Sequence, residues 1–214
     1  MAKVKIIIVT QTYPPRIGGM QSVMKGLAKK LSKYYQVTVL ADHKVPRKEQ
    51  EEGLALEIVS FPVPKVLRNF FKKIYISKLV NKETLLVCDS WKSVLAIPPN
   101  IKNNIIVLAH GQEYLDQRKI NKINSVLSRA TILVSNSKLT KNLAKKILLQ
   151  PKLRHIIIPP TYLMDKNPVS FRKNKNKIPN LLTLTRIDIR KGIRQTMEAL
   201  FSLKKQKKIK DFIW

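Results

Sequence analysis

At 214 residues and 44% hydrophobic composition, the chain can bury a sizeable core, which excludes an intrinsically disordered polymer. Its 42 lysines and arginines outnumber 13 acids and give a net charge of +29. Such a field attracts nucleic acid, anionic lipid or phosphorylated substrates, although many single lysines belong to solvated faces. The single cysteine, Cys88, excludes an internal disulfide framework, and the lack of a long apolar stretch or a signal peptide predicts a cytoplasmic protein.

Short apolar runs alternate with helical patterns over the first three quarters of the chain. Residues 4–9 are almost continuously apolar, as expected for a strand buried on both faces of a parallel sheet. After Gly18 and Gly19, apolar residues recur at helical spacing. That stripe consists of Met20, Val23, Met24, Leu27 and Leu31. Further strands are expected at 37–40, 54–61, 85–88, 105–109, 132–134 and 156–158, with a helix at 137–149. The alternation predicts a doubly wound α/β domain with a parallel sheet.

A proline-rich and polar stretch follows this domain. We predict a first domain over residues 1–160, a linker over 161–179 and a second domain beginning at 180. In the second domain we expect a strand at 181–184, a helix at 193–205 and the next strand at 212–214. A unit of this size is too small to hold its own core, so we expect a second domain cut off soon after its start.

Two strand-to-helix turns place glycine or a cation where anions are commonly held. One spans residues 10–19 and the other residues 184–192, which together suggest a phosphate-bearing ligand. No G-x-G-x-x-G follows the first strand, and the chain contains no P-loop signature and no G-x-S-x-G elbow. The three histidines, His43, His110 and His155, have no Cys or Glu at metal-ligand spacing, so we expect no metal and no cofactor.

Four segments together resemble one family. They are Pro14 to Gln21, Leu108 to Glu113, Val134 to Ser137 and Arg186 to Gly192. In this order they are similar to the retaining glycosyltransferases of the GT-B fold, family 4. The resemblance implies a Rossmann-like acceptor-binding domain, the start of a nucleotide-sugar-binding domain, and catalysis in the cleft between the two.

The resemblance assigns roles to particular residues. Arg186 and Lys191 match the donor-phosphate pair of the family, with two more surface cations as the alternative. Gly18 and Gly19 would let the first loop approach the same diphosphate without side-chain obstruction. His110 is the expected catalytic residue, because it follows a strand at the sheet edge where α/β folds bind ligands.

Two further residues are candidates for the acceptor side. Glu113 could orient a hydroxyl group, or it is a solvated carboxylate. Asn136 could bond across the cleft, although capping of the helix that starts near Ser137 is the better interpretation.

The sequence also departs from the family. Pro159, Pro160, Thr161 and Tyr162 occupy the place of an asparagine-glycine pair, and the glycine-rich strand end and the paired glutamates expected after Trp214 are absent from the chain. We therefore expect a truncated or split enzyme that is inactive alone, or one completed by a second chain that carries the donor domain.

Residues 65–82 combine an apolar helical face with cations, a pattern typical of a helix at an anionic lipid surface. Arg68, Lys72 and Lys73 are the predicted membrane contacts. A core-facing amphipathic helix with solvated lysines is the alternative.

The leading hypothesis is hexosyl transfer from a nucleotide-sugar to a lipid-linked or saccharide acceptor in cell-envelope biosynthesis, such as that of lipopolysaccharide. The enzyme would be cytoplasmic or peripheral on the cytosolic face of the membrane. The alternative is a non-catalytic basic protein that binds nucleic acid or an anionic membrane. Nucleic acid is the less favoured partner, because aromatic residues make up only 7% of the chain and do not alternate with basic ones.

Overall fold

The computed structural model describes residues 4–46, 54–149, 152–160, 181–185, 187–209 and 212–214. The chain forms two compact units, Met1–Met164 and Asp165–Trp214. The predicted linker over 161–179 lies outside the described residues.

The first unit is built on one seven-stranded sheet in which every neighbouring pair is parallel. Its order is β3-β2-β1-β4-β5-β6-β7. The strands are β1 (Lys5–Thr10), β2 (Gln36–Ala41), β3 (Leu56–Ser60), β4 (Leu85–Cys88), β5 (Ile105–Ala109), β6 (Ile132–Ser135) and β7 (Arg154–Ile157). The chain winds outward from β1 to β3 and then returns to place β4 beside β1. This reversal is the switch point at which such sheets bind ligands.

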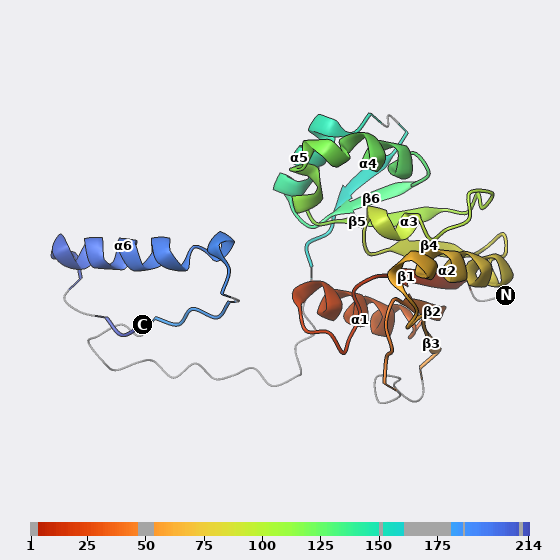
Figure 1. The fold of residues 1–214 in the computed structure, drawn as a ribbon, viewed down its shortest axis with the longest axis horizontal. Coiled ribbons are helices and arrows are strands. Elements are labelled where there is room, and N and C mark those ends of the chain that lie inside the picture. The colour runs from red at the N-terminus through yellow and green to blue at the C-terminus, as the bar shows by residue number, and fades with distance from the viewer. Residues whose placement is uncertain (1–3, 47–53, 150–151, 161–180, 186, 210–211) are drawn as a thin grey trace. The chain divides into compact units, whose positions relative to one another are not determined.

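Helices flank the sheet (Figure 1). They are α1 (Gly19–Leu31), α2 (Lys65–Leu79), α3 (Trp91–Val94), α4 (Ile120–Leu127) and α5 (Lys138–Ile147). Alternate residues of β1 enter two separate cores, because successive side chains of a strand point to opposite faces. Ile6 and Ile8 pack in the core that contains Met24 of α1, whereas Ile7 and Val9 pack in the core that contains Ile76 of α2. The doubly wound α/β architecture predicted from the sequence is confirmed.

The predicted stripe of α1 only partly matches its buried face. Met24 is buried and Leu27 and Leu31 pack against the same core, but Ala28 is the other fully buried residue of the helix. Ala28 is 0% exposed, so a fully buried position of this helix does not need a large apolar residue.

The second unit contains α6 (Ile193–Lys205), which coincides with the predicted helix. The strand predicted at 181–184 does not form in the described structure. Leu182 and Leu184 are 90% and 93% exposed, and the Leu181 amide donates to the Ile213 carbonyl at 2.8 Å. Among the described residues, no ladder of hydrogen bonds pairs with 181–184 and the segment buries no face, so nothing stabilises it as a strand.

Within the described residues, no helix combines the length and the apolar character needed to cross a bilayer.

Candidate functional site

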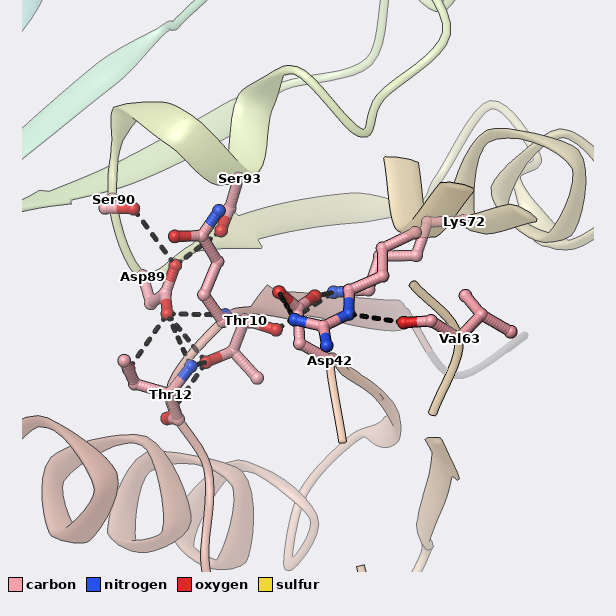
Figure 2. Close-up of polar contacts among 10 residues, drawn as sticks. Thr10, Thr12, Asp42, Val63, Lys72, Asp89, Ser90 and Ser93 are labelled. Carbon is pink, nitrogen blue, oxygen red and sulfur yellow. Dashed lines mark hydrogen bonds and ion pairs between the residues drawn. The ribbon is translucent and has the colours of Figure 1, made fainter. Parts of the chain in front are cut away.

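The carboxyl ends of β1, β4 and β5 meet at one residue, Asp89. Asp89 directly follows β4 and is completely buried. Its Oδ2 atom accepts hydrogen bonds from the residues that leave β1, and its Oδ1 atom accepts from α3 and its cap (Figure 2). The Oδ2 donors are Thr10 Oγ1 at 2.7 Å, the Gln11 amide at 2.8 Å, Thr12 Oγ1 at 2.9 Å and the Thr12 amide at 3.2 Å. The Oδ1 donors are Ser93 Oγ at 2.5 Å and Ser90 Oγ at 3.3 Å. A buried carboxylate needs such a complete set of donors to replace its hydration.

His110 reaches the same point from β5. Its Nε2 atom lies 2.8 Å from the backbone carbonyl oxygen of Asp89. The structure therefore brings the predicted catalytic residue and the first residues of the 10–19 loop together at Asp89, next to the switch point between β1 and β4.

Glu113 holds the turn that carries His110. Its Oε1 atom accepts from the His110 amide at 2.8 Å, within the 3-10 turn Gln112–Tyr114. This carboxylate oxygen fixes the backbone, and Glu113 is partly buried rather than fully solvated. Burial next to the Glu113 charge raises the pKa of Tyr114 well above its usual range, so this buried phenol stays neutral.

Gly111 occupies a position that favours glycine for two reasons, a positive φ and a lack of space for a side chain. Its φ is +99°, and a Cβ atom there would lie 2.8 Å from Thr140 Oγ1 on α5. The same Thr140 hydroxyl donates to Asn136 Oδ1 at 2.6 Å. The helix cap is Ser137, whose Oγ accepts from the Thr140 amide at 3.1 Å. Capping by Asn136 is therefore wrong, because the preceding strand places Ser137 at the capping position and Asn136 one residue too early.

Gly18 and Gly19 form an open helix N-terminus. Gly18 is the N-cap of α1, it supplies no side-chain cap, and no acid occupies the first turn. A Cβ atom at Gly19 would meet nothing within 4 Å, whereas one at Gly18 would meet the flexible end of Gln21 at 2.4 Å. Free backbone N–H groups and the helix dipole make such an N-terminus suitable for an anion.

A second buried cluster lies on the other side of β1. Lys72 of α2 is 1% exposed, and its Nζ atom donates to Asp42 Oδ1 at 2.5 Å and to the Thr10 carbonyl at 2.9 Å. Arg68 approaches Asp42 Oδ2 at 3.6 Å and donates from Nε to the Val63 carbonyl at 2.9 Å. Burial lowers the pKa of Lys72 below its ordinary value, although Asp42 acts in the opposite direction.

This geometry corrects the predicted membrane contacts. Lys72 points into the protein and cannot reach a lipid headgroup, and the guanidinium of Arg68 is turned toward Asp42. Lys73, the remaining cation of the predicted set, is partly exposed. Five apolar residues of α2 are exposed instead, and we call them the α2 ridge. They are Val66, Leu67, Phe70, Phe71 and Ile74, with exposures of 85%, 43%, 58%, 41% and 42%.

The remaining predicted phosphate contacts belong to the second unit. Lys191 is exposed at the end of the 3-10 turn Ile189–Lys191, just before Gly192, whose φ is +68°. Arg186 lies outside the described residues.

The other two histidines make structural contacts, one to a backbone carbonyl and one to a side chain at the end of a strand. His43 Nε2 lies 3.3 Å from the Pro14 carbonyl oxygen, which ties the 10–19 loop to the end of β2. His155 Nε2 lies 2.7 Å from Ser135 Oγ, and burial together with Lys141 and Lys145 lowers the pKa of His155. Among the described residues, no group of three His, Cys, Asp or Glu side chains is arranged to hold a metal ion.

Sequence reasoning missed Asp89 and Asp42. Each is an acid that follows a buried apolar strand, at the carboxyl edge where ligands bind. Their position after a strand could have identified them in the sequence. They were missed because neither residue belongs to the segments that resemble the glycosyltransferases.

No protein-family model and no curated protein matches the sequence. Solved structures do match. The chain is similar to Anabaena Alr3699/HepE in complex with UDP, with a TM-score of 0.53 and 14% identity over 74% of this chain and 44% of that one. It is similar to a trehalose-6-phosphate synthase, OtsA, with a TM-score of 0.54 and 7% identity over 74% of this chain and 49% of that one. This chain thus spans less than half the length of either structure. At these identities the likeness shows the fold, which is Rossmann-like.

Proposed function

We propose that this chain takes part in hexosyl transfer from a nucleotide-sugar to a lipid-linked or saccharide acceptor of the cell envelope. The observation that supports the proposal is the convergence of His110 and the 10–19 loop at Asp89. HepE has been solved with UDP and with UDP-glucose, and the fold is shared with this chain. UDP is therefore the first nucleotide to test.

In this proposal the donor diphosphate lies at the N-terminus of α1. Negative charge grows on the leaving diphosphate during transfer, so N–H groups aimed at it lower the barrier. The open Gly18–Gly19 terminus offers such groups without a competing side-chain cap or acid. Within the first unit, His110 contacts the transferred sugar or the acceptor. The donor-phosphate role of Arg186 and Lys191 stays a separate proposal for the second unit.

Calorimetric and NMR titrations with inorganic pyrophosphate, UDP and UDP-glucose test the proposal. Gly19→Asp is the decisive variant, because the site has room for a side chain in the protein itself. A new carboxylate at a helix N-terminus stabilises the helix but repels a diphosphate. We expect at least about tenfold weaker UDP binding, or about 1.4 kcal/mol, at an equal or higher Tm.

Gly19→Ala is the matched control for size. It adds a methyl group without charge, so it measures how closely the diphosphate approaches the backbone. Equal affinity of wild type and Gly19→Asp would contradict the proposal, as would a wild-type chain that binds neither UDP nor pyrophosphate at millimolar concentration.

We further propose that the protein is peripheral at an anionic membrane and that the α2 ridge enters the interface. Large apolar side chains usually avoid solvent, yet five of them line one exposed face of α2. The net charge of +29 and the nearby Lys73 complement anionic headgroups.

Co-sedimentation with vesicles of phosphatidylglycerol and phosphatidylcholine tests the membrane proposal. We expect Phe70→Ser with Phe71→Ser to lose most of the binding, because burial of the ridge is the part of the affinity that the general positive charge does not supply. Leu139→Ser is the control, since Leu139 is 69% exposed on α5. If the two variants lost binding equally, or if neither lost any, vesicle binding would be explained by nonspecific charge attraction alone, and the proposed role of the α2 ridge would be wrong.

A further inference from the structure

The hydrogen bond between His110 and Asp89 fixes which ring nitrogen carries the proton. Nε2 of His110 lies 2.8 Å from the Asp89 carbonyl oxygen. A carbonyl oxygen can only accept, so Nε2 must donate. In the neutral ring this leaves Nδ1 with a lone pair. Within the described part of the chain, the hydrogen bond of the His110 ring is the one from Nε2, and none is found at Nδ1.

The position of this carbonyl is itself strongly determined. The Asp89 amide donates to the Val9 carbonyl at 3.2 Å, and both carboxylate oxygens are occupied by donors from β1 and α3. The side chain is completely buried. The peptide of Asp89 is therefore held from two sides, and the direction of its carbonyl follows.

We propose that Asp89 is a positioning residue with two coupled tasks. Its carboxylate holds the first residues of the 10–19 loop, and its carbonyl selects the His110 tautomer in which Nδ1 accepts a hydrogen bond. The chemical group that Nδ1 receives is then a hydroxyl of the sugar or of the acceptor, an assignment that rests on the proposed function. A group with only acceptors, such as a phosphate oxygen, would be repelled by the neutral ring.

The other histidines provide an internal comparison. His43 Nε2 also faces a carbonyl oxygen, that of Pro14, so it must carry a proton as well. His155 Nε2 faces the Ser135 hydroxyl, which can donate or accept, so its tautomer is not fixed by that contact. The structure thus assigns the Nε2–H form to His110 and His43 but leaves His155 open.

The experiment is a ¹⁵N correlation spectrum of the imidazole rings at a pH where they are neutral, with His110→Gln used to assign the signals. We expect His110 to show a protonated Nε2 and an unprotonated Nδ1 in the absence of any ligand. A dominant Nδ1–H form of His110 would overturn the proposal.

Variants then test the role of Asp89. Asp89→Ala should give a mixture of His110 tautomers and at least about tenfold faster hydrogen exchange of the Gln11 and Thr12 amides. Ser93→Ala is the matched control, because it removes a donor to Oδ1 and leaves the loop contacts at Oδ2 intact. It should keep the wild-type tautomer and the wild-type exchange.

If Asp89→Ala does not fold, Asp89→Asn decides the question through the same two measurements, with smaller changes in the same direction. Wild-type ring signals and wild-type exchange in the folded Asp89 variant would overturn the positioning role.

Addition of UDP-glucose separates the two proposals. A shift of the His110 Nδ1 signal supports the hydroxyl assignment. No shift, with the Nε2–H tautomer present in the free protein, would contradict the proposed function and the hydroxyl assignment but leave the positioning role standing.

Discussion

Asp89 and Asp42 lie on opposite sides of β1, at the same edge of the sheet, but they are satisfied in opposite ways. Asp89 is surrounded by hydroxyl and amide donors that carry no charge. Asp42 faces the cations Lys72 and Arg68. Thr10 joins the two clusters, since its hydroxyl donates to Asp89 and its carbonyl accepts from Lys72.

The difference shows that, at the carboxyl edge of the sheet, the Asp89 cluster fixes a geometry whereas the Asp42 cluster balances buried charges. Neutral donors from three elements fix Asp89 in one geometry, which suits a residue that positions a loop and a histidine. Two cations of α2, Lys72 and Arg68, bind this helix to the ends of β1 and β2. Removal of Lys72 leaves the Asp42 carboxylate without its closest cation, and removal of Asp42 leaves the buried Lys72 ammonium without its anion. Substitutions in each cluster should therefore affect stability differently.

The largest effect is expected from Lys72→Met. The variant keeps most of the side-chain volume but leaves Asp42 without its closest cation in a largely buried position. We expect a loss of about 3–5 kcal/mol in the free energy of unfolding, measured by urea titration.

The double variant Lys72→Met with Asp42→Asn is the control for that loss. It removes both charges, so most of the stability should return. A double variant as unstable as Lys72→Met would mean that packing, and not the uncompensated charge, causes the loss.

Asp89→Asn should have a smaller effect, about 2 kcal/mol, measured in the same way. The amide oxygen can replace Oδ2, and the amide nitrogen can donate to the hydroxyls of Ser90 and Ser93. The hydrogen bonds can therefore form, but the charge that strengthens each of them is lost and the loop is held less tightly. A loss as large as that of Lys72→Met would show that the amide cannot satisfy the donors of Thr10 and Thr12.

The fold was predictable because its signals are local. Continuous apolar runs separated by helical patterns led to a parallel α/β sheet, and the strands at 85–88 and 105–109 coincide with β4 and β5. The strand at 181–184 was wrong, because an apolar pattern alone cannot show whether a segment has a ladder partner, and no ladder is formed by these residues in the described structure.

In the candidate site, the sequence could predict single residues from their place after a strand, but not their partners. His110 was found because it follows a strand, but its partner is the main-chain carbonyl of Asp89, which no side-chain pattern encodes. Lys72 was assigned to the surface because helical periodicity does not reveal that a long side chain can pair with Asp42, thirty positions away. Tertiary pairing decided both cases.

The pH dependence of stability should distinguish the two clusters. The pKa of Lys72 is lowered in the folded state by burial, so the unfolded chain binds more protons as the pH passes from that lowered value toward 10.5. The contribution of Lys72 to stability therefore rises with pH in that window. We expect the difference in unfolding free energy between wild type and Lys72→Met to widen there. The corresponding difference for Ser93→Ala, which changes no ionisable group, should stay flat.

The smallest effect is expected from Ser93→Ala, about 1 kcal/mol in urea titration. It removes the 2.5 Å bond to Asp89 Oδ1, but Ser90 Oγ remains within 3.3 Å of the same oxygen. In the Asp89→Asn background the serine would bond an uncharged amide, so its removal should cost less there. A double-mutant cycle measures the difference directly. Strict additivity would mean that the energy of the Ser93 hydrogen bond does not depend on the charge of Asp89. The bond from Ser93 to Oδ1 would then not contribute to stabilising the buried carboxylate.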